Sequence, residues 1–190
     1  MNQAFLPLFE EAALDHKHII FGWLNSSHIK EFWDNSVAHR QDIVSFMKGD
    51  KEPRTYFQGI FTYWIGSLEG KPYCLVMTAE VCKDKKDYPQ IWKDYLSPTG
   101  RTYSIDFCIG NIAFFGKGLA APTLEAFMQF FQENVDEKAD TFFIDPDDNN
   151  PRAKHVYAKA GFDLVGDYVM EGGVFDGKKT DFMVKKLRPK

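Results

Sequence analysis

The sequence predicts an α+β fold in which a mostly antiparallel sheet contains one parallel crossover. Three observations predict it: helical periodicity up to about residue 50, alternating β-rich runs after it, and a strand–helix–strand pattern between residues 103 and 144. A parallel strand pair needs a long crossover, which the amphipathic stretch Leu119–Val135 can supply. The chain has 190 residues and no linker-like segment, so we expect a single domain over residues 1–190.

The first half of the chain is expected to pass from helices to a hairpin. A strand and three helices are predicted over Ala4–Phe9, Leu14–Asn25, His28–Trp33 and His39–Met47. The β-rich runs Tyr56–Leu68 and Pro72–Val81 flank Glu69-Gly70-Lys71, a turn pattern that predicts a hairpin. The segment Lys83–Gly100 is polar and is expected to carry one short helix, Gln90–Tyr95.

The second half alternates strands and helices. Its predicted strands are Tyr103–Ile109, Thr141–Ile144, Gly166–Val174 and Thr180–Leu187. The helix Leu119–Val135 has one apolar stripe, made by Leu124, Phe127, Met128, Phe131 and Val135. A second helix, Asn150–Ala160, is expected to end at Gly161, which can adopt the left-handed conformation of a helix C-terminus.

The composition is that of an ordinary globular protein with many aromatic residues. Hydrophobic residues make up 44% of the chain and aromatic residues 16%, including 18 Phe, and we expect most of the aromatic side chains in the core. The net charge is −4 at neutral pH. This balance argues against nucleic-acid binding, which requires a basic surface, and is compatible with a cationic substrate.

Cysteine, histidine and N-terminal patterns indicate a cytoplasmic protein without a metal centre. The three cysteines, Cys74, Cys82 and Cys108, have no CxxC spacing and are expected to be reduced thiols. The N-terminus lacks a basic signal-peptide region, and the apolar run Ile19–Leu24 is too short to span a bilayer. The five histidines show no metal-ligand spacing, so no metal is expected: His16, His18, His28, His39 and His155.

A glycine-bearing loop connects the strand IDFCIG to the long helix. In the loop Phe115–Leu119, Gly116 and Gly118 allow close backbone approach, and Lys117 adds a positive charge. Free N–H groups and the positive dipole end at a helix N-terminus can bind a phosphate or pyrophosphate. The alternative is an ordinary tight turn.

A second motif follows the strand that ends at Asp145. The residues from Asn150 to Phe162 fit the pattern N-x-x-A-x-x-x-Y-x-x-x-G-F. Together with the upstream G-x-G-L loop, this pattern resembles the GCN5-related N-acetyltransferase (GNAT) superfamily. The resemblance covers the C-terminal half directly. It implies a GNAT fold, with a central splayed parallel strand pair in a mixed, mostly antiparallel sheet flanked by helices, and acetyl-CoA as the cofactor.

The N-terminal half narrows the resemblance. The stretch Gly22–Trp33 is similar to W-L-N-x-S-H-I-x-x-W-W of aminoglycoside 6'-N-acetyltransferases, and Arg101–Gly110 to their R-G-I-D-x-x-[IL] strand. Asp106 stands where siderophore hydroxylysine acetyltransferases tend to have His. Ala113 departs from the Gln or Arg that usually begins the phosphate loop, which leaves Lys117 as the nearest side-chain charge.

The resemblance implies direct transfer of an acetyl group from acetyl-CoA to an amine of a small polycationic acceptor, the 6'-amine of aminoglycosides. The alternatives are another acceptor amine, on a siderophore hydroxylysine, a polyamine or a protein N-terminus, and a noncatalytic acyl-CoA-binding module. A monomer or a homodimer is expected, without a nucleic-acid or membrane partner.

Direct transfer needs an acceptor for the amine proton, a donor to the departing thiolate and polarisation of the thioester carbonyl. Asp106 is the candidate base or ammonium anchor, with pairing to Arg101 or a lysine as the alternative. Tyr157 is the candidate acid, with packing under the sheet as the alternative. Backbone N–H groups at Cys108 and Ile109 would polarise the carbonyl, and the Cys108 thiol itself is expected to be buried and inert.

Further residues are assigned to binding. Asp145 is a candidate for a second substrate ammonium group, with helix capping or turn stabilisation as the alternative. Trp33 is a candidate wall for a sugar ring or, alternatively, a core side chain. Asn150 and Arg152 are expected to face the CoA arm, although Asn150 can also be a plain N-cap. Acidic residues of Lys83–Gly100 are expected to join Asp106 and Asp145 at the acceptor.

Overall fold

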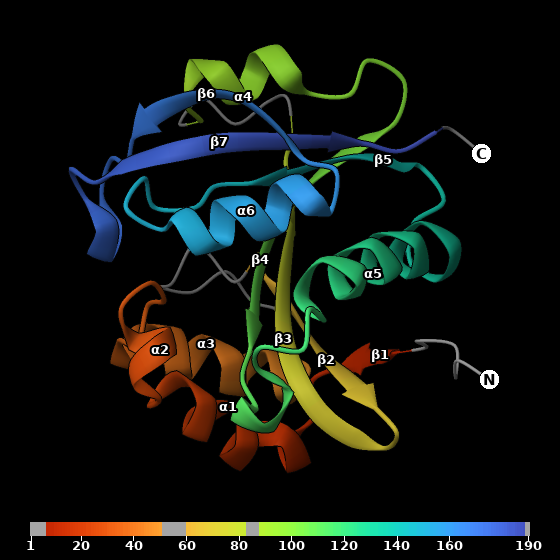
Figure 1. The fold of residues 1–190 in the computed structure, drawn as a ribbon, viewed down its shortest axis with the longest axis vertical. Helices are drawn as coiled ribbons and strands as arrows, with labels where there is room; N and C mark the ends of the chain where they lie inside the picture. The colour runs from red at the N-terminus through yellow and green to blue at the C-terminus, as the bar shows by residue number, and fades with distance from the viewer. Residues whose placement is uncertain (1–6, 51–59, 83–87, 189–190) are drawn as a thin grey trace. The chain divides into compact units, whose positions relative to one another are not determined.

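The computed structural model describes residues 7–50, 60–82 and 88–188. Seven strands form one sheet in the order β1-β2-β3-β4-β5-β7-β6 (Figure 1). They are β1 (Leu8–Glu11), β2 (Thr62–Leu68), β3 (Lys71–Glu80), β4 (Arg101–Ile109), β5 (Ala139–Ile144), β6 (Asp163–Val169) and β7 (Lys179–Lys186). Strands β4 and β5 pair in parallel, whereas β1–β2, β2–β3, β5–β7 and β6–β7 are antiparallel. The predicted fold class is confirmed.

Six α-helices accompany the sheet in the described part of the chain. They are α1 (Lys17–Leu24), α2 (Ser27–Lys30), α3 (Val37–Met47), α4 (Gln90–Tyr95), α5 (Ala120–Asn134) and α6 (Pro151–Lys159). The bounds of α4 are those predicted, and most other elements begin or end within a few residues of prediction. The first predicted helix is divided, because a 3-10 turn over Leu14–His16 precedes α1.

Two predicted strands differ from those observed. The N-terminal strand was predicted over Ala4–Phe9 but lies later in the chain, at β1 (Leu8–Glu11). Residues 4–6 of that prediction lie outside the described residues, as do residues 56–59 of the predicted first strand of the hairpin. The strand predicted over Gly166–Val174 is wrong at both ends, since β6 spans Asp163–Val169. Gly172 and Gly173 have φ of +79° and +70°, a left-handed conformation that a strand cannot contain.

The chain folds into two compact units, each made of two segments. The first unit contains the described residues up to 78 together with 107–126, and the second contains 79–106 and 127–188. Strands β3 and β4 and helix α5 therefore contribute to both units.

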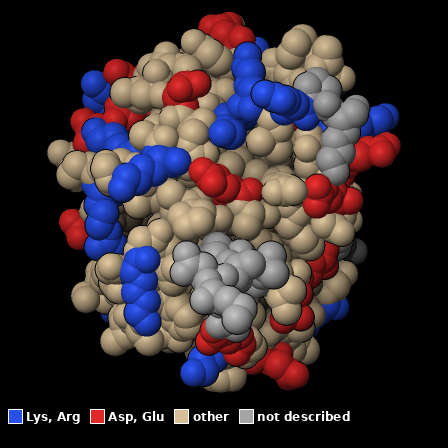
Figure 2. All heavy atoms as spheres, turned by 45° about the vertical axis from the view of Figure 1, so that its right-hand side comes forward, with Lys and Arg blue, Asp and Glu red and all other residues tan. Residues whose placement is uncertain are grey.

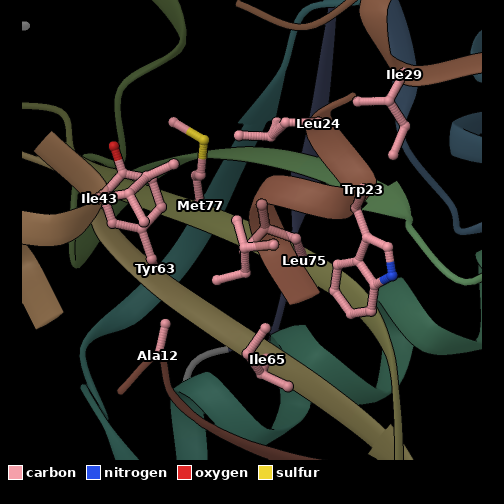
Figure 3. Packing of buried hydrophobic residues seen from close by; sticks show 10 residues of the cluster. Ala12, Trp23, Leu24, Ile29, Ile43, Tyr63, Ile65, Leu75 and Met77 are labelled. Carbon is pink, nitrogen blue, oxygen red and sulfur yellow. The ribbon is translucent and has the colours of Figure 1, made fainter. Parts of the chain in front are cut away.

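The core of the first unit is formed by α1, α2 and α3 against β2 and β3 (Figure 3). Fully buried side chains fill it: Ile20, Leu24, Ile43, Tyr63, Ile65 and Leu75. Burial of each such side chain stabilises the fold by roughly 1.5–3 kcal/mol relative to its exposed state. The partly buried Trp33 packs against this cluster, which is the core position considered for it from the sequence.

The second unit is built around β7, whose side chains alternate between two faces. Phe182 points to the α4 side, where its ring stacks on Trp92 with centroids 5.7 Å apart. Asp181 points to the other side, where its carboxylate accepts from Lys154 of α6 at 2.8 Å. Helices α4 and α6 therefore cover opposite faces of this part of the sheet (Figure 1).

Charged side chains of both signs lie on the face of the molecule drawn in Figure 2. On the face drawn in Figure 2, Lys and Arg side chains are interspersed with Asp and Glu side chains. Among the residues that the structure describes, no helix has both the length and the apolar character needed to cross a membrane.

Candidate active site

The glycine loop has the backbone geometry of an open cradle. After β4, a 3-10 turn (Ile112–Phe114) leads to Gly116 and Gly118, which both have φ of +69°, and α5 begins at Ala120. A Cβ at either glycine would meet no atom of the described residues within 4 Å, apart from those of its chain neighbours. Open space above the backbone, with the free N–H groups of a 15-residue helix behind it, fits an approaching pyrophosphate group.

Tyr73 of β3 holds both ends of the segment that joins β4 to α5. Its carbonyl oxygen accepts from the N–H groups of Gly110 and Asn111 at 2.8 and 3.1 Å. Its hydroxyl bonds to Thr123 Oγ1 at 2.8 Å, and that oxygen donates to the Leu119 carbonyl at 2.7 Å. The sequence shows only a tyrosine in a β-rich run, which carries no information about these contacts.

Two residues of the N-terminal stretch also contact this region. The ring of His28 meets the ring of Phe115 edge-on with centroids 4.4 Å apart, and its Nε2 lies 3.3 Å from the Ile109 carbonyl oxygen. Because the carbonyl can only accept, Nε2 carries the proton in this contact. The Trp23 ring lies where a side chain at Gly110 would be. Both residues belong to the stretch that resembles the aminoglycoside enzymes, so a sequence signal for them existed.

Gly110→Ala is expected to destabilise the first unit. The added Cβ would lie 2.0 Å from Cδ2 of Trp23, and overpacking of this kind costs about 1–3 kcal/mol. Urea unfolding followed by tryptophan fluorescence measures the loss. Gly22→Ala is the matched control, since Gly22 precedes Trp23 in α1 and a Cβ there comes within 4 Å of no atom in the described part of the chain outside its own helix. Equal stability of both variants would contradict the packing described for Trp23.

Two carboxyl groups come together in the second unit at the carboxyl ends of the parallel strands. The β4–β5 register runs from Arg101↔Ala139 to Ser104↔Phe143 and stops there, with Asp106 two residues further along β4. Asp145 directly follows β5. Both side chains are half-buried. An ion pair between Asp106 and Arg101, considered as the alternative role of Asp106, is wrong, because Arg101 pairs instead with Asp136 at 3.3 Å and Glu80 at 3.8 Å.

Asp145 is held by a tyrosine and does not cap a helix. The hydroxyl of Tyr168, on β6, donates to Asp145 Oδ2 at 2.6 Å. Asp147 stabilises the turn by accepting from Asn149 N–H at 2.9 Å. Asn150 is the N-cap of α6, accepting from Ala153 N–H at 3.0 Å. Turn stabilisation and helix capping, the alternative roles considered for Asp145, are therefore performed by Asp147 and Asn150.

Burial changes the acidity of both carboxyls. Burial raises the pKa of Asp106 to about 7, and the negative charge of Asp145 adds to this effect. Burial also raises the pKa of Asp145, to about 6, against the opposing effect of the Tyr168 hydrogen bond. A pair of this kind titrates jointly. Its second proton leaves near neutral pH, in contrast to an ordinary carboxyl, and this makes the pair a competent proton acceptor there.

The other predicted site residues are divided between the two units. Tyr157 lies on α6 in the second unit, is buried, and has its ring 6.3 Å from that of Phe162. Arg152, in the first turn of α6, is exposed. Cys108 is half-buried and packs against the core of the first unit. Asp84 and Asp87, of the predicted acidic segment, lie outside the described residues, and Asp94 is exposed.

Potential metal ligands are scattered. Within residues 7–50, 60–82 and 88–188, no three His, Cys, Asp or Glu side chains are arranged to hold a metal ion. His39 belongs to a buried polar network, in which its Nδ1 donates to the Asp34 carbonyl oxygen at 2.7 Å. The cysteines Cys74, Cys82 and Cys108 are all free thiols.

The mixed sheet with its parallel β4–β5 pair is the architecture expected of an acetyltransferase of the GNAT class. A family model described as an acetyltransferase (GNAT) domain matches residues 13–170. The chain therefore belongs to this family, and the resemblance found in its motifs is confirmed.

Particular relatives are aminoglycoside-modifying enzymes. The chain is similar to aminoglycoside N(6')-acetyltransferase type 1 of Klebsiella pneumoniae and of Serratia marcescens, each 26% identical over 155 residues, covering 82% of this chain and 73% of the relative. Among solved structures, AAC(6')-Ib with coenzyme A and kanamycin has a TM-score of 0.72 at 21% identity, covering 95% of each chain. An aminoglycoside N(6')-acetyltransferase of Legionella pneumophila has a TM-score of 0.66 at 22% identity, covering 96% of this chain and 93% of that one.

Proposed function

We propose that this protein acetylates the 6'-amine of aminoglycosides or of closely similar polycationic molecules, with acetyl-CoA as the acetyl donor. The observation that carries the proposal is the half-buried pair of Asp106 and Asp145. Two carboxylates that repel each other gain most from a cationic ligand, which relieves the repulsion. The named activity of the relatives agrees with this chemistry. We place the activity in the cytoplasm, in one domain over residues 1–190, with antibiotic resistance as one consequence.

The glycine loop is the part of the chain that would hold the CoA moiety. Gly116 and Gly118 leave the backbone N–H groups before α5 accessible, and Lys117 adds a charge suited to phosphate. Asn150 and Arg152, at the start of α6, would contact the CoA arm. When bound, acetyl-CoA supplies an acetyl group activated as a thioester.

The proposed roles of the side chains follow from the proton transfers that the reaction requires. Asp106 accepts the proton that the acceptor amine must lose, and its raised pKa makes it suited to this task near neutral pH. Asp145 attracts an ammonium group of the acceptor. Tyr157 is the proposed proton donor to the leaving thiolate, and the N–H groups of Cys108 and Ile109 are the proposed donors to the carbonyl oxygen.

A panel of amines tests this function. Purified protein is mixed with acetyl-CoA and one acceptor at a time, and the release of free thiol is measured. The acceptors are kanamycin, a polyamine, N6-hydroxylysine and a peptide with a free N-terminus. We expect the largest kcat/KM with kanamycin. If only N6-hydroxylysine is acetylated, the acceptor is a siderophore hydroxylysine and not an aminoglycoside. CoA binding without turnover of any amine would indicate a noncatalytic module.

Salt should weaken acceptor binding, because several charges contribute to it. We expect KM for kanamycin to rise with ionic strength, since each partly exposed charge contact is screened over about 8 Å at physiological salt. Asp145→Ala should raise KM for kanamycin more than it lowers kcat, because it removes ground-state attraction. Steady-state kinetics at two salt concentrations measure both effects. A kanamycin KM that is unaffected by salt and by Asp145→Ala would contradict the assignment of Asp145.

A further inference from the structure

The two carboxyls of the site differ in their partners. Asp145 Oδ2 accepts a 2.6 Å hydrogen bond from the hydroxyl of Tyr168. The side chain of Asp106 forms no hydrogen bond or ion pair with any residue in the described ranges. Since a hydrogen bond to a carboxylate stabilises its charged form, the half-buried charge of Asp145 is compensated and that of Asp106 is not.

The packing around Tyr168 fixes the direction of its hydroxyl. Its half-buried ring meets Trp92 of α4 and Phe182 of β7 edge-on, with centroids 6.2 Å from both. The backbone is held by the β6–β7 register, in which Tyr168 faces Thr180. Burial and the neighbouring carboxylates raise the pKa of Tyr168 far above its ordinary value, so the hydroxyl keeps its proton and remains a donor.

Three other carboxylates in this part of the chain form ion pairs with lysines. Asp147 pairs with Lys178 at 3.5 Å, Asp181 with Lys154 at 2.8 Å, and Asp167 with Lys179 at 3.3 Å. Besides burial, the acidity of Asp106 is affected by the charge of Asp145, and the acidity of Asp145 by hydrogen bonds from the Tyr168 hydroxyl and from its own backbone N–H.

We propose that Tyr168 is a positioning residue that holds Asp145 as the ionised member of the pair, which leaves Asp106 to take the proton from the acceptor amine. The inference rests on the proposed function and assigns different tasks to two carboxyls that resemble each other in sequence. A fixed charge on Asp145 also makes Asp106 a stronger base, because a like charge nearby favours the protonated form of Asp106. In the proton transfer, the amine loses one proton and Asp106 gains it, with Asp145 ionised throughout.

The test is the pH dependence of kcat/KM for kanamycin in Tyr168→Phe. Without the hydroxyl, Asp145 retains its proton to higher pH, so fewer molecules have both carboxyls ionised at a given acidic pH. We expect a loss of about tenfold near pH 6 that shrinks to within about twofold near pH 9, where both groups are ionised in either protein. The ratio of variant to wild type at each pH cancels the titration of the substrate amine.

Asp145→Asn is expected to change the profile in the opposite direction. Removing the like charge lowers the pKa of Asp106, so the acidic limb of kcat/KM should move to lower pH while the plateau falls. Tyr103→Phe is the matched control, because the Tyr103 hydroxyl donates to Asp136 at 2.8 Å elsewhere in the same unit. Its profile should keep the wild-type shape. A Tyr168→Phe defect that is absent, or constant over the whole pH range, would overturn the inference.

A titration that needs no substrate separates this inference from the proposed function. Carboxyl 13C chemical shifts, followed against pH in the wild type, should show Asp145 ionising before Asp106, and Tyr168→Phe should narrow or reverse that order. Wild-type protein that shows this order without acetylating kanamycin would disprove the proposed function but keep the assignment of Tyr168. Simultaneous or reversed ionisation in the wild type would disprove the assignment, whatever the substrate.

Discussion

Asp106→Asn is expected to lower kcat for kanamycin by at least about tenfold while leaving CoA binding and the fold intact. The scale is that of losing one acid–base group. Asn has nearly the same shape as Asp but cannot accept the amine proton. Thiol-release kinetics measure kcat, and calorimetric titration with CoA measures binding. Near-normal turnover of a folded variant would remove Asp106 from the mechanism.

The same substitution is expected to stabilise the free protein at neutral and higher pH. Because the pKa of Asp106 is raised on folding, the folded state binds the proton more tightly than the unfolded state. The contribution of Asp106 to the free energy of unfolding is therefore fully present below its unfolded pKa near 4, and this contribution is lost as the pH rises through its folded pKa of about 7. Asp106→Asn removes this loss, so we expect a gain on the order of 1–2 kcal/mol above pH 7 and almost none near pH 4.

Asp136→Asn provides a control of opposite sign for this stability effect. Burial acts to raise the pKa of Asp136, but hydrogen bonds from Tyr103 and from the Lys138 N–H, together with the Arg101 charge, outweigh it and lower the pKa. Its ionised form therefore stabilises the fold above the unfolded pKa, and the variant should be less stable at neutral pH. Urea unfolding at several pH values distinguishes the two. Lower stability of Asp106→Asn than of wild type at pH 8 would contradict the electrostatics described for the pair.

Gly118→Val is expected to weaken CoA binding by at least about tenfold. A β-branched residue disfavours the left-handed backbone found at Gly118, where φ is +69°, by about 1–3 kcal/mol. Its side chain would also occupy the open space above the loop, where none of the described residues beyond the chain neighbours of Gly118 comes within 4 Å of the Cβ position. Calorimetric titration of CoA into the folded variant measures the loss.

Gly70→Val separates backbone strain from loss of the cradle. Gly70 has φ of +72° in the turn between β2 and β3, and a Cβ there also meets nothing within 4 Å. The two variants should lose similar stability, but only Gly118→Val should lose CoA affinity. Unchanged affinity in a folded Gly118→Val variant would disprove the assignment of the loop.

Much of the fold was predictable because local patterns carry it. The bounds of α4 were predicted correctly, since Pro89 and Pro98 limit the helical stretch between them. The alternating and 3.6-residue patterns placed β4, α5 and β5 in order, and order with a long crossover indicates a parallel pair. The prediction past Val169 failed because the predicted strand was carried through Gly172 and Gly173, where the chain turns.

The sequence by itself predicted the family, the glycine loop and the candidate residues Asp106 and Asp145, because each of these predictions depends on residue types at fixed spacing along the chain. Only the tertiary structure decided how the site is supported. Tyr168 reaches Asp145 across 23 positions of the chain and Tyr73 reaches Thr123 across 50. Periodicity tells which face of a strand a side chain occupies, whereas strand order and register decide which distant side chain it meets there. The difference between the two carboxyls arises at that level, from a single hydroxyl that one of them contacts and the other does not.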